Sequence, residues 1–143
     1  MIARPNIVAA ARGWIGTPYR HQASVKGIGC DCLGLVRGVY RELFGAEPED
    51  VPPYTPGWGE GGAEALRDAA ARHLVPIAVE MAREGDVVLF RMTRGGVAKH
   101  AAILTAPNTM IHAYSGHAVM ETALTDWWRR RRTYAFSFPD GID

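Results

Sequence analysis

The sequence predicts an α+β fold in which N-terminal helices pack on a C-terminal antiparallel β-sheet. Apolar residues recur at helical spacing in the first half of the chain, whereas short segments rich in β-branched and aromatic residues follow Gly85. The turns between those later segments are short, and parallel neighbours would need long crossover connections. Helices therefore come first and an antiparallel sheet second.

Three helices are expected in the first half of the chain. The first covers residues 5–15, where the apolar side chains fall on one stripe behind an initial proline. The second begins near Cys32 and ends at Gly45, which suits a helix terminus. A proline- and glycine-rich stretch at residues 47–62 predicts an irregular loop, and residues 63–74 predict the third helix.

Five strands are expected in the second half of the chain. They cover residues 86–92, 100–105, 109–114, 117–122 and 133–138. Between the last two strands, residues 127–132 have the sequence Trp-Trp-Arg-Arg-Arg-Arg. We expect this run to be a solvated turn with aromatic anchors rather than a binding patch.

Length and composition exclude several classes of protein. The 143 residues predict one domain spanning residues 1–143, and 48% hydrophobic with 22% charged residues is typical of a folded domain. A formal charge of +1 offers no global field for nucleic acid or an anionic membrane. No segment approaches the roughly 18 consecutive apolar residues of a membrane-spanning helix, and the N-terminus lacks a signal-peptide pattern. We therefore expect cytoplasmic synthesis, no nucleic-acid partner and no membrane insertion.

The two cysteines, Cys30 and Cys32, are separated by one residue. A disulfide across so small a loop would be strained, so the sequence does not predict a disulfide scaffold. Cys32 falls in the first turn of the second helix, where the helix dipole favours a thiolate, and Asp31 is expected to be the structural N-cap. Cys32 is therefore a candidate nucleophile; the alternative is a small buried residue without chemistry.

Two histidines are candidates for the base that activates a thiol. His100 opens one expected strand, and His112 lies on the next. A two-residue turn between these strands would put the two side chains on opposite faces, whereas a register that pairs Ala102 with His112 puts them on one face. We therefore expect an odd-length turn or a bulge there. The alternative is that each histidine is structural.

A zinc site is a competing interpretation of the same side chains. Cys30, Cys32, His100 and His112 are chemically adequate ligands for a Cys2His2 centre. Structural zinc sites, however, have roughly two to four residues between paired cysteines, and this chain has fewer. The sequence therefore favours a thiol site without a metal or an organic cofactor.

Five segments resemble, in order and spacing, the successive motifs of the NlpC/P60 cysteine peptidases. They are Thr17-Pro18-Tyr19-Arg20, Gly29-Cys30-Asp31-Cys32-Leu33-Gly34-Leu35-Val36, Gly85-Asp86-Val87-Val88-Leu89-Phe90, His100-Ala101-Ala102-Ile103 and Met110-Ile111-His112-Ala113. The resemblance covers nearly the whole chain. It implies a papain-like α+β fold and cleavage of peptidoglycan stem peptides, often at the D-γ-glutamyl to diaminopimelate bond.

The resemblance also implies roles for particular residues. Cys32 is the nucleophile, His100 is the base, and His112 is the third polar residue, which orients His100. We expect the Nδ1–H of His100 to point at His112, and the Cys32 backbone N–H and the Tyr19 hydroxyl to receive the oxyanion. The thiolate attacks the amide carbonyl, His100 protonates the leaving amine, and water hydrolyses the thioester.

The chain departs from the usual family pattern at two places beside the expected cleft. Leu33 follows the candidate nucleophile in place of serine, and His21-Gln22-Ala23-Ser24 replaces the usual aromatic-Gly-Gly. His21 is therefore a candidate substrate contact. Variants of this kind resemble the branch encoded in phage tail and gene-transfer-agent clusters.

That narrower resemblance implies a function within a particle. We expect attachment to a tail-tip, hub or baseplate protein of a phage-like particle or gene transfer agent, through the loop around Trp58 or through residues 127–132. Hydrolysis from the periplasm would then open the cell wall locally. The alternatives are a catalytically silent structural or binding component of a tail tip, and transfer of the acyl group to an amine or alcohol.

Overall fold

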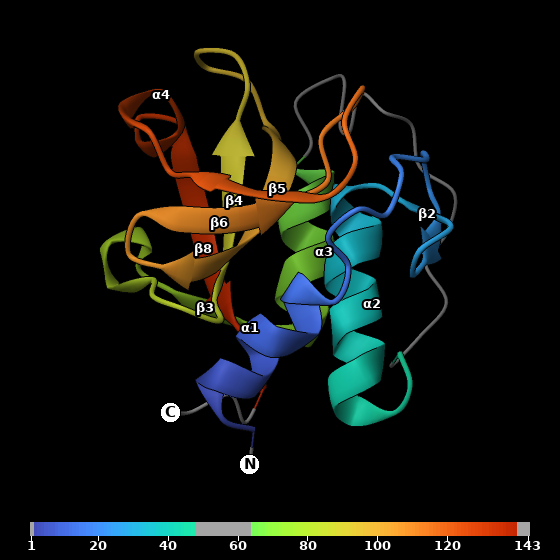
Figure 1. Ribbon diagram of the computed structural model, residues 1–143. Helices are drawn as coiled ribbons and strands as arrows, with labels where there is room; N and C mark the ends of the chain where they lie inside the picture. The colour runs from blue at the N-terminus through green and yellow to red at the C-terminus, as the bar shows by residue number, and fades with distance from the viewer. Residues whose placement is uncertain (1, 48–63, 140–143) are drawn as a thin grey trace.

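The computed structural model describes residues 2–47 and 64–139, and it has the α+β fold that the sequence predicts. Three helices lie on one face of a six-stranded antiparallel sheet, and a fourth, short helix lies on the other side (Figure 1). The helices are α1 (Arg4–Arg12), α2 (Cys32–Phe44), α3 (Ala65–His73) and the short α4 (Asp126–Arg129). None of the described helices is long and apolar enough to cross a membrane.

The sheet has the order β3-β8-β4-β5-β6-β7, and all its neighbouring strands are antiparallel. The strands are β3 (Val75–Ile77), β4 (Val87–Arg91), β5 (Ala98–Ala106), β6 (Thr109–His112), β7 (Met120–Ala123) and β8 (Arg132–Ser137). Strands β4 to β8 are those expected from the sequence. The sequence does not predict β3, because Pro76 lacks a backbone donor and is tolerated in a sheet only at an edge.

Three short elements complete the described structure. Strands β1 (Ser24–Val25) and β2 (Gly29–Cys30) form an antiparallel hairpin between α1 and α2. A 3-10 helix, η1 (Val79–Met81), connects β3 to β4. The predicted loop at residues 47–62 lies, apart from Glu47, outside the described residues.

Helix α2 begins at the residue that carries the candidate nucleophile because the preceding residue caps it. Asp31 has extended backbone angles, and its Oδ1 accepts a hydrogen bond of 2.7 Å from the backbone N–H of Gly34. At the other end, Gly45 has a φ of 85°, a left-handed conformation that glycine adopts without strain. Both ends of the helix therefore agree with the sequence prediction.

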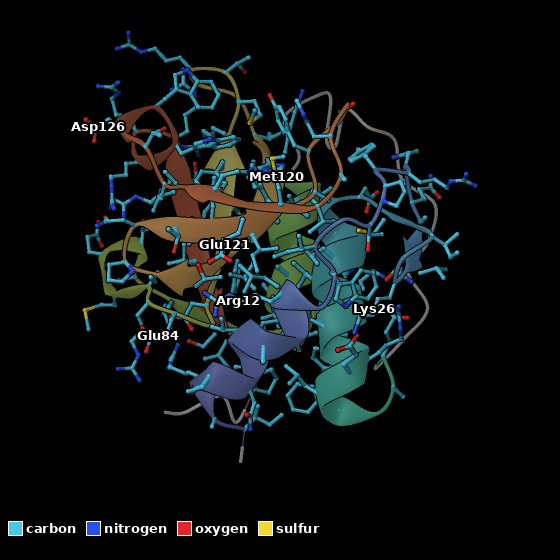
Figure 2. All side chains as sticks on the ribbon, viewed as in Figure 1. Arg12, Lys26, Glu84, Met120, Glu121 and Asp126 are labelled. Atoms are coloured by element: carbon cyan, nitrogen blue, oxygen red, sulfur yellow. The ribbon has the colours of Figure 1, made fainter. Side chains whose placement is uncertain are left out.

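Helix α1 is held by apolar packing rather than by its surface charges. Ile7 and Ala11 are buried in the cluster between the helices and the sheet. On the outer side, Arg12 and Glu121 of β7 point toward one another, with 3.0 Å between Nη2 and Oε2 (Figure 2). Because this ion pair is exposed to solvent, it contributes little to stability.

The segment after α1 lies in close contact with α2 at Gly38. A Cβ atom at this position would lie 2.0 Å from the ring of Trp14, which is itself only 1% exposed. Gly38→Ala is therefore expected to lower the free energy of unfolding by about 3 kcal/mol, measured by urea denaturation. The same substitution should cost less in a Trp14→Leu background, and equal costs in the two backgrounds would contradict the steric explanation.

Apolar side chains fill both faces of the sheet. One cluster lies between the helices and the sheet, and a second cluster, which includes Phe90, lies on the far face under Trp128. In the expected solvated turn with aromatic anchors at residues 127–132, Trp128 is therefore an anchor. Its ring turns inward, with its centroid 5.0 Å from that of Phe90, whereas Trp127 is 42% exposed.

Candidate active site

Cys32 and His100 line one surface pocket at the N-terminal end of α2. The thiol comes from the first residue of the helix and the imidazole from strand β5. The other lining residues are Tyr19, His21, Asp31, Met92, Lys99, Ala113, Tyr114 and Ser115. The fold therefore brings the candidate nucleophile and the candidate base together from distant parts of the chain.

The Cys32 thiol is protonated in the resting site. Burial, followed by the Asp31 carboxylate, raises the pKa of Cys32 to about 12, although backbone hydrogen bonds with Ala101 and Leu33 act in the opposite direction. The sequence predicts a thiolate favoured by the helix dipole. Burial outweighs that effect because Cys32 is only 6% exposed. The thiol therefore needs a base before it can attack.

The register between β5 and β6 places the two histidines on the same face of the sheet. Ile103 pairs with Ile111, and this register puts Ala102 opposite His112. A bulge at Thr105 takes up one residue before the turn between the two strands. This bulge agrees with the sequence expectation of an odd-length turn or a bulge, because without it the side chains would point to opposite faces.

The two imidazoles are hydrogen-bonded to each other. Nε2 of His100 lies 2.8 Å from Nδ1 of His112, and Nε2 of His112 lies 3.0 Å from Oγ1 of Thr122. The expectation that Nδ1 of His100 points at His112 is therefore wrong. The nitrogen farther from the backbone, Nε2, reaches across to β6, so Nδ1 of His100 takes no part in this contact.

Both imidazoles are uncharged near neutral pH. Burial, followed by the neighbouring His112, lowers the pKa of His100 to about 3. Burial, followed by His117, lowers the pKa of His112 to about 4. An uncharged imidazole can accept a proton. The resting site thus holds a neutral thiol and a neutral base rather than a thiolate and an imidazolium.

Trp128 covers the histidine pair, a contact that the sequence does not predict. Its ring centroid lies 5.2 Å from that of His100 and 5.3 Å from that of His112. The run of like charges that follows it suggested exposure. Leu124, which precedes α4, and Trp128 both pack in the cluster on the far face of the sheet.

Tyr19 and His21 line the pocket from the segment that precedes α2. Tyr19 forms an isolated bridge with Cys30, and burial is the largest cause that raises the pKa of Tyr19 to about 12. Its hydroxyl therefore keeps its proton at neutral pH and can donate a hydrogen bond. Nδ1 of His21 lies 3.7 Å from Oδ2 of Asp31. The structure places both side chains where a bound substrate can reach them.

Asp31 forms part of the pocket wall and fixes the backbone around it. Besides capping α2, it accepts through Oδ2 a hydrogen bond of 2.7 Å from the backbone N–H of Gln22. Gln22 has a φ of 64°, an uncommon conformation for a residue other than glycine. One buried carboxylate therefore ties the segment that carries His21 to the start of the helix.

The side chains considered as zinc ligands do not gather into one site. Among residues 2–47 and 64–139, no three Cys, His, Asp or Glu side chains are grouped so that they could hold a metal ion. Cys30 is buried in the cluster between the helices and the sheet, and it does not line the pocket that contains Cys32. The geometry therefore favours a thiol site over a Cys2His2 centre.

Comparison with known proteins agrees with this geometry. Over 119 residues the chain is 31% identical to "Murein DD-endopeptidase MepS/Murein LD-carboxypeptidase" of Escherichia coli (strain K12), covering 82% of this chain and 54% of that protein. It is 28% identical over 128 residues to "Gamma-DL-glutamyl hydrolase" of Bacillus subtilis (strain 168), covering 89% of this chain and 27% of that protein. The chain thus spans about half the length of the first of these relatives.

A solved structure and a family pattern each cover most of the molecule. The crystal structure of the NlpC/p60 domain of the peptidoglycan hydrolase SagA superposes with a TM-score of 0.63 at 29% identity, covering 94% of this chain and 98% of that one. The pattern of the NlpC/P60 family matches residues 16–136, which include α2 and all the strands that surround the pocket. The chain therefore belongs to the NlpC/P60 family.

Proposed function

We propose that this protein is a cysteine endopeptidase that hydrolyses the stem peptides of peptidoglycan. The observation that carries the proposal is the shared pocket of Cys32 and His100, with His112 hydrogen-bonded behind His100. The name of one relative points to the same substrate class, because it describes a murein endopeptidase. The pocket lies open at the protein surface, as a polymeric substrate requires.

The reaction begins with proton transfer from the neutral thiol. Nδ1 of His100 accepts the proton as the Cys32 sulfur attacks the carbonyl carbon of the scissile amide. The backbone N–H of Cys32 and the hydroxyl of Tyr19 donate to the oxyanion. The imidazolium then protonates the leaving amine, which departs and leaves a thioester. A water molecule, deprotonated by His100, hydrolyses the thioester and regenerates the thiol.

The scissile bond in this proposal is the D-γ-glutamyl to diaminopimelate amide. Its support is the motif resemblance described above and the relative named as a gamma-DL-glutamyl hydrolase. The relative from E. coli is named as a DD-endopeptidase, which would cut a different bond of the same polymer. Product identity separates the two bonds, since each leaves different amino acids on the released fragment.

The test is digestion of purified peptidoglycan, with the soluble fragments identified by mass spectrometry. Wild type is expected to release fragments that end at γ-D-glutamate, and Cys32→Ala is expected to release none. Cys30→Ala is the matched control, because it removes a thiol two positions away that does not line the pocket. If folded, reduced wild type and Cys32→Ala both release nothing, the proposal fails and a binding or structural role replaces it.

We further propose that the protein acts as part of a phage-like tail or gene transfer agent, made in the cytoplasm and acting in the periplasm. The support is the pair of sequence departures at Leu33 and at residues 21–24. On the described surface, the exposed ring of Trp127 with Arg131 stacked 3.6 Å from its centroid is the contact we assign to a tail-tip, hub or baseplate protein. Trp58 lies outside the described residues.

The particle assignment has its own experiment. Particles purified from the producing cells by density gradient are probed for this chain, in wild type and in a Trp127→Ala, Arg131→Ala double variant. The wild-type chain is expected in the particle fraction, and the variant is expected to remain with the soluble cell proteins. A wild-type chain found only among soluble cell proteins would contradict the assignment without affecting the peptidase proposal.

A further inference from the structure

The hydroxyl of Thr122 contacts His112, and Thr122 does not line the pocket. In the pairing of β6 with β7, Met120 lies opposite His112 and Thr122 lies opposite Met110. Thr122 is therefore on the same face as His112, one diagonal step away. Its Oγ1 is 3.0 Å from Nε2 of His112, within hydrogen-bond distance. A continuous chain of contacts thus runs from Thr122 through His112 to His100.

The protons in this chain can be arranged in only one way if His100 is to act as a base. Nδ1 of His100 must be unprotonated to accept from Cys32, so its single proton sits on Nε2. That proton points at Nδ1 of His112, which must then be the acceptor. The proton of neutral His112 therefore sits on Nε2, and it must be donated to Oγ1 of Thr122.

The opposite arrangement is chemically possible and unproductive. If His112 carried its proton on Nδ1, it would donate to Nε2 of His100 and force the proton of His100 onto Nδ1. His100 would then have no lone pair to offer the thiol. The Thr122 hydroxyl can accept from Nε2 of His112 or donate to it, and only the arrangement in which it accepts leaves His100 able to act as a base.

We infer that Thr122 is a positioning residue for the peptidase: its hydroxyl accepts the Nε2 proton of His112 in the arrangement that leaves Nδ1 of His100 free for the thiol of Cys32. This inference rests on the proposed function for its catalytic consequence. The tautomer of His112 in the resting protein is a separate consequence that needs no substrate.

Thr122 can be altered with little change in shape, and the same sheet supplies a matched control. Thr122→Val replaces the hydroxyl by a methyl group of similar size, and Thr122→Ser keeps the hydroxyl. Thr109 lies on β6 next to Met110, the residue that pairs with Thr122. Its Oγ1 contacts Oγ1 of Thr105, at 2.6 Å, rather than a histidine. Thr109→Val therefore removes a hydroxyl from the same pair of strands without touching the chain of imidazoles.

The experiment combines kinetics on soluble stem peptide with histidine-selective 15N NMR of the resting protein. Thr122→Val is expected to lower kcat by about tenfold with KM unchanged, because only the positioning of the base is lost. The spectrum of wild type should show His112 protonated at Nε2, and that of Thr122→Val should show both tautomers. Thr122→Ser should restore both readouts, and Thr109→Val should alter neither.

Two results would overturn the inference. One is a Thr122→Val protein that keeps kcat within twofold of wild type and retains the Nε2-protonated form of His112. The other is a wild-type spectrum in which His112 is protonated at Nδ1. Because the spectra are recorded without substrate, an inactive wild type would count against the proposed function alone, and the tautomer measurement would still decide the role of Thr122.

Discussion

Replacing His100 by alanine is expected to lower kcat/KM for stem-peptide cleavage by at least about a thousandfold, with the fold retained. The size of the effect follows from the resting state of the thiol. Burial raises the pKa of Cys32 to about 12, so almost no thiolate exists at pH 7 unless a base removes the proton. His100 shares the pocket with Cys32, as His21 also does, and it is His100 that is hydrogen-bonded to His112.

The loss in His100→Ala should be partly recovered at high pH, because hydroxide can then generate the thiolate without the imidazole. Adding Cys32→Ala to His100→Ala should lower the rate little further, since nucleophile and base act as one unit. His73→Ala is the matched control, because His73 lies at the end of α3 and does not line the pocket. A His100→Ala protein that keeps more than a tenth of wild-type activity would show that another group activates the thiol.

Local rules predict the parts of this site that depend on neighbouring residues in the chain. Asp31 caps α2 because a side-chain oxygen at that position can accept from the first turn, and the spacing of residues specifies this directly. The common face of His100 and His112 follows from the two-residue period of a strand, once the need for a bulge is recognised. Each of these inferences involves segments joined by a short turn.

The parts that the sequence does not predict arise from contacts between distant segments. The protonated state of Cys32 depends on how deeply α2 is buried against the sheet, which no local pattern states. The use of Nε2 rather than Nδ1 by His100 depends on how far the ring reaches toward β6. Trp128 covers the histidines because α4 folds over the far face of the sheet, whereas the arginines that follow it in sequence suggested a solvated turn.

Removing the ring of Trp128 is expected to change the pH dependence of both activity and stability. The Trp128 ring contacts His100 and His112, and we expect a ring in this position to keep water from them. In Trp128→Ala, water reaches the imidazoles, so the pKa of each should rise toward its usual value of 6.5. The acid limb of kcat/KM, which follows protonation of the base in the free enzyme, should move to higher pH by at least about one unit.

The free energy of unfolding is expected to fall as the pH is lowered below 6.5. In the native protein the pKa of His100 and of His112 lies below 6.5, whereas both groups titrate normally in the unfolded chain. As the pH falls below 6.5, the unfolded chain takes up protons that the native protein does not, so the free energy of unfolding decreases toward the native pKa values. The free energy of unfolding of wild type should therefore fall by several kcal/mol between pH 7 and pH 4. Each unit of difference between the native and unfolded pKa contributes about 1.4 kcal/mol.

Trp128→Ala should be less stable than wild type at pH 7, because a large packed ring is lost, yet its stability should depend less steeply on pH below 6.5. Trp127→Ala tests whether the effect is specific, since Trp127 is 42% exposed, meets the Trp128 ring edge-to-face and lies under the Arg131 guanidinium. Trp128→Phe should keep most of the shielding of the two imidazoles from water, and its pH dependence should stay close to that of wild type. Trp128→Ala and Trp127→Ala could instead show the same acid limb of kcat/KM and the same slope of stability with pH. Trp128 would then not control the protonation of His100 and His112, and burial in the pocket alone would keep His100 uncharged.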